Sequence, residues 1–315
     1  MNTHADMNSE VSELKGSARN APFFIRSLLL PVTMVSLLTI AHFFMTQGYD
    51  IPSVLGALTF VGFFIVALCE RLWPLHPEWN SNSHHDFQVD ILHFIHNGFW
   101  VQTIQTFARV GCAIIAIHMT QFFGGTVWPN HWHWSLQVAL GLVVGESVEY
   151  WLHRLQHEVP WFWRFHAVHH SSPRLYWLNA VRFHPIDVVF TTVGRLAPVA
   201  MMGGSPMIIG LLTLFSGVHA VFMHCNIPMR VGALNWILST GELHRWHHST
   251  NLEEANTNYG GDLIIWDILC GTRFQPKDRE PPAVIGLANM AHYPMNFWEQ
   301  IKSPFRWQKI LQDNQ

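Results

Sequence analysis

Two apolar segments near the start of the chain restrict its fold more than any other feature. They run from about Ile25 to Thr46 and from about Ile51 to Cys69, and each is close to the roughly 20 apolar residues that cross the hydrocarbon core of a bilayer. Inside lipid only helices and closed barrels satisfy all their backbone hydrogen bonds. Because a short turn separates the two segments, the sequence predicts a transmembrane helical hairpin.

The composition agrees with a membrane protein. Hydrophobic residues make up 49% of the 315 residues and charged residues 12%, whereas charged residues are roughly 25% of a soluble domain. The basic residues form no continuous run, so nucleic acid is not expected as a partner. The four cysteines lie far apart, which argues against a disulfide framework and against a cysteine-based metal site.

Three further apolar regions complete the predicted membrane part. One at about 89–117 is interrupted by polar residues, and one at about 136–151 follows the aromatic stretch WPNHWHW, which is typical of a membrane interface. A region at about 188–221 contains Arg195 and several prolines and glycines, which favours a re-entrant or interfacial hairpin. We expect an all-α integral membrane protein with about four transmembrane helices, this helical hairpin and a histidine-rich helical cap.

The placement of lysine and arginine orients these segments. Basic residues precede the first segment and follow the second and fourth segments. No lysine or arginine lies between the first and second segments or between the third and fourth. By the positive-inside rule, both termini and the cap face the cytoplasm. We expect residues 1–20 to be a disordered cytoplasmic N-terminus and 21–315 a single membrane-embedded domain, with the cap formed by about 152–187 and 224–290. Without a sorting signal or retention motif, the sequence fits a bacterial inner membrane.

Histidine is the unusual residue of this sequence, with 22 copies against 18 lysines and arginines together. The stretches HRLQH, FHAVHH and LHRWHH space histidines three and four residues apart, so on helices each cluster would aim its rings one way. Imidazole is the commonest protein metal ligand. A structural zinc needs four ligands, so this larger set favours two iron-type ions with open positions. The candidates are His153, His157, His166, His169, His170, His244, His247 and His248.

The three clusters resemble the HxxxH, HxxHH and HxxHH boxes of the fatty acid hydroxylase/sterol desaturase superfamily. The flanking stretches EYWLHR, PWFWRFHAVHHSS, NAVRFHP, HCN and NYGGDLIIWDILCGT are also similar, over roughly 146–279. The resemblance implies a four-span helical fold whose cytoplasmic cap holds two iron ions. It also implies activation of O2, and hydroxylation or desaturation at an unactivated C–H of a lipid such as a sterol, a fatty acyl chain or an amino-lipid.

The resemblance also implies roles for single residues. The eight histidines of the boxes would be iron ligands, and His224, just after the last apolar region, would be a further one. A ligating ring usually donates its other N–H to a carboxylate or carbonyl, so nearby carboxylates are candidates for orienting the rings, although each also fits an ordinary helix-end or surface position. The additional or orienting candidates are His184, His219, Glu146, Glu149 and Asp187.

Electrons for such a reaction must come from outside the chain, because the sequence has no GxGxxG fingerprint, no CxxCH haem site and no iron–sulfur cysteine pattern. A ferredoxin- or cytochrome-type donor with its reductase is therefore expected. Two other functions were weighed. A zinc-dependent membrane hydrolase needs a glutamate where HRLQH has Arg154, and a metal transporter or sensor would place its ligands within the spans.

Overall fold

A computed structural model of the chain describes residues 21–81 and 86–315, so the expectation for residues 1–20 lies outside the described residues. The helices are α2 (Leu29–Thr46), α3 (Ile51–Leu72), α4 (Phe87–Phe123), α5 (Trp134–Glu158), α6 (Pro160–His170), α7 (Pro185–Met201), α8 (Pro206–His224), α9 (Gly241–His247), α10 (Leu252–Ala255), α11 (Ile265–Cys270), α12 (Phe297–Lys302) and α13 (Trp307–Asp313). Shorter helical turns are η1 (Phe24–Leu28), η2 (Pro77–Asn80), η3 (Trp177–Val181), η4 (Gly232–Trp236) and η5 (Ser303–Arg306). The all-α expectation is confirmed, since the described residues add only two isolated bridge pairs to these helices.

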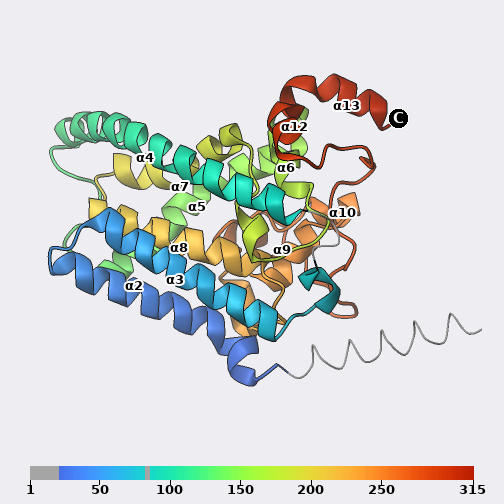
Figure 1. Ribbon diagram of the computed structural model, residues 1–315. Coiled ribbons are helices and arrows are strands. Elements are labelled where there is room, and N and C mark those ends of the chain that lie inside the picture. The colour runs from blue at the N-terminus through green and yellow to red at the C-terminus, as the bar shows by residue number, and fades with distance from the viewer. Residues whose placement is uncertain (1–20, 82–85) are drawn as a thin grey trace, which may run out of the picture.

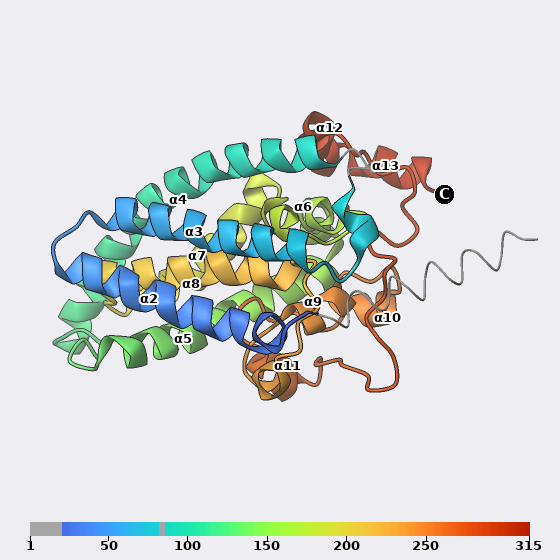
Figure 2. The same ribbon diagram turned by 60° about the horizontal axis from the view of Figure 1, so that its bottom comes forward.

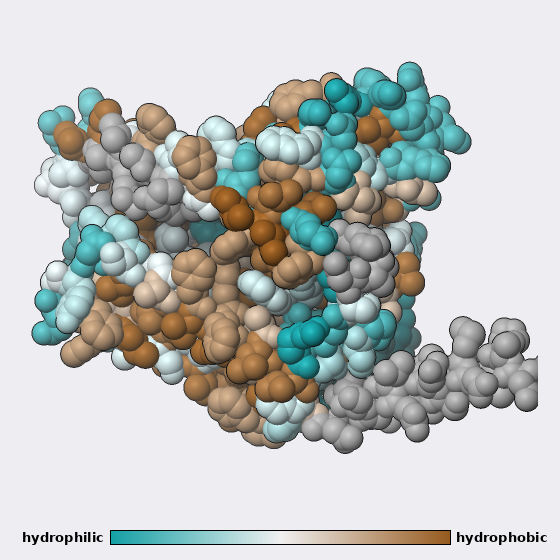
Figure 3. Space-filling view, in the orientation of Figure 1, coloured by the Kyte–Doolittle hydropathy of each residue, from teal (hydrophilic) through white to brown (hydrophobic). Residues whose placement is uncertain are grey.

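The six long helices run along one common direction and form a bundle around α8 (Figures 1 and 2). The core contains fully buried Val66 of α3 and Leu211 and Val218 of α8. Large side chains on the outside remain exposed, among them Phe64 at 68% and Phe107 at 74%. Hydrophobic residues cover much of the bundle surface in Figure 3, while hydrophilic ones gather around α12 and α13. An apolar outer surface of this extent is typical of a lipid-facing bundle.

Three helices are long and apolar enough to cross a membrane: η1 with α2 (Phe24–Thr46), α3, and α8. The predicted first hairpin is confirmed as α2 and α3. The predicted hairpin at 188–221 is the pair α7 and α8. Of these two helices α8 is long and apolar enough to cross a membrane, so it is longer than the short re-entrant segment that we expected. Helices α4 and α5 are as long but carry many polar residues, so the number of about four spans stays a prediction.

Glycine allows α5 and α7 to approach closely. A Cβ atom at Gly145 of α5 would lie 2.5 Å from the carbonyl oxygen of Arg195 in α7, so no larger residue fits without moving a helix. The contact brings the end of α5 beside the start of α7. The stretch HRLQH on α5 therefore lies next to Asp187 on α7.

A proline sets the corner between α5 and α6. Val159 is extended and Pro160 is the first residue of α6, as expected because proline disfavours a helical conformation in the residue before it and is preorganised to begin a helix. The corner turns α6 back against the end of α5. As a result, the rings of the first histidine box face those of the second.

Candidate metal centre

The structure brings all nine predicted ligands together in two groups. In each group every residue offers one potential ligand atom, and these atoms all lie within 4.8 Å of one another. We call site A the group of His153, His157, His166, His170 and His247, and site B the group of His169, His224, His244 and His248. The ligands come from the cap end of α5, from α6, from the end of α8 and from α9 with its C-cap residue.

The two histidine triplets are not divided between the sites as their spacing predicts. We expected each triplet to aim its rings one way, but α6 gives His166 and His170 to site A and His169 to site B. Likewise His247 belongs to site A, whereas His244 and His248 belong to site B. Both triplets lie between the sites, so each helix serves both groups.

The rings of site A point unprotonated nitrogens toward one another. The Nδ1 atom of His166 donates to Asp187 at 2.9 Å, that of His247 donates to the Thr257 carbonyl at 2.7 Å, and that of His153 to the Tyr259 carbonyl at 2.5 Å. A neutral ring that donates through Nδ1 has only a lone pair at Nε2. Yet the Nε2 atom of His153 lies 3.1 Å from that of His166 and 3.2 Å from that of His247. A cation between these nitrogens would remove the repulsion.

Site B repeats this arrangement. The Nδ1 atoms of His169 and His224 donate to the carbonyls of Arg182 and Ala220, at 3.2 and 2.8 Å. Their Nε2 atoms are 3.1 Å apart. The Nε2 atom of His244 lies 3.1 Å from that of His224 and 3.0 Å from that of His248. The rings of His169 and His224 therefore also point nitrogen lone pairs at each other, while the Nδ1 atoms of His244 and His248 are buried without a hydrogen-bond partner among the described residues.

The spacing of these nitrogens suits shared coordination. Two imidazoles bound at right angles, with bonds of about 2.0–2.1 Å, hold their nitrogens about 3 Å apart, and the observed separations are 3.0–3.2 Å. The Nε2 atoms of His157 and His170 are buried without a hydrogen-bond partner among the described residues. Buried polar atoms are normally satisfied, so these two atoms also fit metal ligands. The sites adjoin each other, with the rings of His170 and His248 stacked at 4.3 Å.

Burial keeps the rings neutral. Burial lowers the pKa of His166, His169, His170, His244, His247 and His248 well below the usual value for histidine, and neighbouring rings lower it further. Only the neutral ring can coordinate a metal. The environment therefore favours the ligating form of these side chains.

Two buried carboxylates support the loop that orients site A. The carbonyls of Thr257 and Tyr259, which fix His247 and His153, belong to this loop. Glu146 accepts hydrogen bonds from the backbone N–H groups of 261, 262 and 263, at 2.7–3.1 Å. Asp267 accepts those of Tyr259 and 260, at 2.8 and 2.7 Å. Glu146 therefore reaches the ligands through this loop and not by direct contact, and Asp267 was not predicted.

Asp187 is the candidate carboxylate that contacts a ligand directly. It is fully buried and accepts from both His166 and the side-chain amide of Gln156. Burial raises the pKa of Asp187 to about 7, although the neighbouring histidines and the hydrogen bond from Gln156 lower it in part. A carboxylate behind a ligating imidazole fixes its tautomer and raises its basicity, so the contact matches the predicted orienting role.

The structure places the other three candidates outside both sites. Glu149 pairs with Arg195 at 2.9 Å. His219 lies 3.4 Å from Asp262 and stacks on the ring of the residue one helical turn before it. His184 caps α7 by accepting the N–H of residue 186, and its other nitrogen donates to the carbonyl of residue 301. His184 thus connects the C-terminal segment to the bundle.

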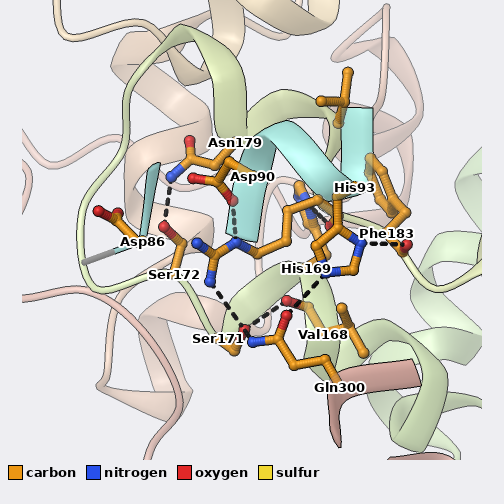
Figure 4. Close-up of polar contacts among 12 residues, drawn as sticks. Asp86, Asp90, His93, Val168, His169, Ser171, Ser172, Asn179, Phe183 and Gln300 are labelled. Atoms are coloured by element: carbon orange, nitrogen blue, oxygen red, sulfur yellow. Dashed lines mark hydrogen bonds and ion pairs between the residues drawn. The ribbon is translucent and has the colours of Figure 1, made fainter. Parts of the chain in front are cut away.

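Sequence analysis missed a polar stripe on α4 that supports site B. Asp90, His93 and Asn97, together with the helix N-cap Asp86, are buried. Asp90 and His93 face the loop 171–183 in Figure 4, and Asn97 contacts the carbonyl groups of residues 181 and 183 in the same loop. Asp90 accepts from Arg182 at 2.5 Å, and Asn97 donates to the carbonyl of residue 183 at 2.9 Å. His93 is fully buried, and its Nδ1 atom lies 3.2 Å from the carbonyl oxygen of residue 183. It is satisfied, with Gln300 2.9 Å from its Nε2 atom.

The stripe contacts His169, a predicted metal ligand, through this loop. The carbonyl of Arg182 accepts from His169, and the ring of Phe183 stacks on His169 at 4.2 Å with an interplanar angle of 6°. Positions 86, 90, 93 and 97 repeat at the helical spacing. That repeat of polar residues on one face of the helix was the signal available in the sequence.

The chain is similar to known proteins both over most of its length and in the part that carries the histidine sites. Residues 138–272 match the family model described as fatty acid hydroxylase. The chain is 38% identical to ornithine lipid hydroxylase OlsE of Rhizobium tropici over 288 residues, which cover 89% of this chain and 84% of that protein. No solved structure matches the chain.

More distant relatives are similar over the part that carries the histidines. Human alkylglycerol monooxygenase is 32% identical over 178 residues, covering 56% of this chain and 37% of its own. Methylsterol monooxygenase erg25B of Aspergillus fumigatus is 25% identical over 174 residues, covering 50% and 56%. The chain covers only about a third to a half of these two relatives, but most of OlsE. With its helical bundle and its histidine sites, this protein belongs to the fatty acid hydroxylase/sterol desaturase superfamily of membrane enzymes.

Proposed function

We propose that this protein is a di-iron, O2-dependent hydroxylase of a membrane lipid. The observation that carries the proposal is the convergence of bare imidazole nitrogens in two adjoining groups, five rings in site A and four in site B. A single structural zinc would use four ligands, whereas two irons with open positions use a set of this size. Two irons bound here would supply the oxidising power to activate O2 and to replace a C–H bond by C–OH.

The side chains of the protein would prepare these sites. The Nδ1 atoms of His153, His166 and His247 are held by two carbonyls and a carboxylate, which orients each Nε2 atom before a metal binds. Eight of the nine rings are buried, so the protein excludes water that would compete for the oxidant. Among the described residues no flavin or nicotinamide motif accompanies the sites, and we infer that a ferredoxin- or cytochrome-type protein with its reductase delivers the electrons.

The proposed substrate class follows from OlsE, most of whose length the chain covers. OlsE, at 38% identity over 84% of its length, is named as an ornithine lipid hydroxylase. We therefore propose an amino-lipid of the ornithine type as the first substrate to test, ahead of alkylglycerols and sterols. Desaturation by the same sites is the alternative, because it begins with the same removal of a hydrogen atom.

A zinc-dependent hydrolase is not favoured. Arg154 occupies the place of the general-base glutamate, and its Nε donates to Glu158 at 2.8 Å on a partly exposed helix face. The general base that such an enzyme needs is thus replaced by an ion-paired cation. The histidine sites lie at the ends of α5, α8 and α9, which supports a cap at one face of the membrane. From the placement of lysine and arginine we propose that this face is the cytoplasmic side of a bacterial inner membrane.

Lipid profiling tests the proposed function. The gene would be expressed in a host that makes ornithine lipids, and the lipids compared by mass spectrometry with those of the same host carrying the His247→Ala variant. We expect an amino-lipid heavier by one oxygen atom only with the wild-type protein. Loss of two hydrogens would indicate desaturation, and an unchanged lipid profile with iron-loaded protein would contradict the proposal.

A further inference from the structure

A surface pocket lies on the outer side of α6, away from both histidine sites. It has a volume of about 570 Å³ and is formed by the first half of α6, by η5 and by the start of α13. Its lining includes Trp161, Arg164, Phe165, Phe305, Arg306 and Lys309. None of the nine predicted ligands lines it, so the pocket is distinct from the metal centre.

The charged groups of the pocket are all cations. No aspartate or glutamate is among its lining residues. Arg306 forms an ion pair with Glu299 at 2.9 Å, and Glu299 also pairs with Lys302. Arg164 and Lys309 have no ion-pair partner among the described residues. The Nε atom of Arg164 is also buried without a hydrogen-bond partner. The pocket therefore offers two unpaired positive charges to an anionic group.

The remaining walls are aromatic and lead toward the membrane helices. Trp161 is 49% exposed and Phe305 72% exposed. Trp161 also contacts Phe190 in the middle of α7, with ring centroids 6.5 Å apart, and Phe162 contacts the same ring at 5.3 Å. An apolar strip thus continues from the cationic pocket onto α7, which forms a hairpin with the membrane-crossing α8.

We propose that this pocket binds an anionic lipid. The phosphate or carboxylate of the headgroup pairs with Arg164 and Lys309, and the first part of an acyl chain lies along Trp161 and Phe190. Tryptophan and basic residues together are typical of the membrane interface, where anionic headgroups attract lysine and arginine. A free phosphate or an acidic soluble protein would use the cations but would gain nothing from the apolar strip. The proposal does not depend on iron or on the reaction.

The test measures lipid retention by the full chain. Protein in nanodiscs of phosphatidylcholine with a minor fraction of phosphatidylglycerol is released and its bound lipids are counted by native mass spectrometry. We expect the wild type to retain phosphatidylglycerol in preference to phosphatidylcholine. The double variant Arg164→Gln/Lys309→Gln should reduce this retention by about tenfold or more, because each basic residue at an anionic surface contributes about a fivefold factor.

A matched variant controls for total charge. Arg230→Gln/Lys277→Gln removes two cations from another part of the cap surface, remote from the pocket lining, and should retain phosphatidylglycerol like the wild type. A Trp161→Ala variant keeps both cations and should also lose retention, and millimolar phosphate alone should not displace the lipid. Equal retention by the wild type and the Arg164/Lys309 variant would overturn the proposal. So would displacement by free phosphate, or a variant that weakens binding of an acidic ferredoxin while lipid retention is unchanged.

Discussion

A buried imidazole that donates through Nδ1 to a carbonyl or a carboxylate has one nitrogen lone pair left, and here those lone pairs face one another. His153, His166 and His247 meet in site A, and His169 and His224 in site B, with Nε2 separations of 3.1–3.2 Å. Folding alone does not stabilise such an arrangement, because it brings acceptors together without donors. The cations that we propose for these sites would stabilise it.

Removing one ring should therefore remove metal. We expect His247→Ala to lower bound iron and to abolish the lipid product, and His169→Ala to do the same through site B. His131→Ala is the control, since His131 is exposed and belongs to neither site. Iron is measured on purified protein by plasma emission spectroscopy. Full activity of His247→Ala would contradict the assignment of site A.

Asp187 leads to a second prediction, which concerns the metal affinity of site A. Asp187→Asn preserves the shape of the side chain but removes the charge that faces His166, so the affinity of site A for metal should fall by about 10–100-fold. Asp313→Asn, in the exposed last turn of α13, is the matched control. Metal affinity is measured by competition with a chelator, and unchanged affinity in Asp187→Asn would show that this carboxylate does not orient a ligand.

Residue identity was predictable where the side chain itself coordinates. The spacing of the histidine boxes located eight of the nine rings that the structure brings together, and the resemblance added the ninth, His224. The partition into two sites was not predictable, because it depends on how α6 and α9 cross. The orienting carbonyls of Thr257, Tyr259 and Arg182 leave no mark in the sequence, since every residue has a carbonyl.

The polar face of α4 leads to a prediction about the free energy of unfolding. Asp90→Asn leaves the guanidinium of Arg182, which is 0% exposed, without its charge partner. Breaking a buried ion pair by removing one partner costs about 3–5 kcal/mol. Chemical denaturation in detergent should show this loss, together with weaker metal binding at site B. Arg154→Gln, which breaks a partly exposed pair with Glu158, should cost less than about 1 kcal/mol. Similar effects of the two variants would contradict the assigned role of α4.

The contact between α5 and α7 is tested at its glycine. Gly145→Ala places a methyl group 2.5 Å from the carbonyl oxygen of Arg195, and overpacking of this kind costs about 1–3 kcal/mol. Gly217→Ala on α8 is the control, because a Cβ there meets no atom within 4 Å. The midpoint of thermal unfolding should fall in the first variant and stay level or rise in the second. Equal midpoints would show that α5 and α7 can separate without cost.

Hydropathy predicted the bounds of α2 and α3 well, but it predicted the bounds of the other long helices less accurately. The fourth apolar region was expected to end at about residue 151, yet α5 continues to Glu158, so the first histidine box lies on the same helix. The polar residues of α4 and α5 lower the hydropathy of these helices. Their partners, such as Arg182 for Asp90 and Arg195 for Glu149, lie far away in the sequence, and hydropathy does not record that pairing.

For the whole molecule, the structure places the cap at one end of the bundle. The ends of α3 and α8, the start of α2 and the segment with α12 and α13 lie at this end (Figures 1 and 2). Segment 290–315, outside the predicted cap, also packs there through η5 against α6. We expect the N-terminus, the C-terminus and the histidine sites to face the cytoplasm. Single cysteines at Gln315 and at Asn130 should label from opposite sides of intact membrane vesicles, and labelling from the same side would contradict this topology.

The central claim is that nine imidazoles hold two irons side by side. Iron counting combined with X-ray absorption at the iron edge, on protein purified from iron-replete cells, tests it most directly. We predict two irons per chain, each in a shell dominated by imidazole nitrogens, and loss of iron in His247→Ala and His169→Ala. One zinc per chain, or iron without histidine in its first coordination shell, would contradict the account.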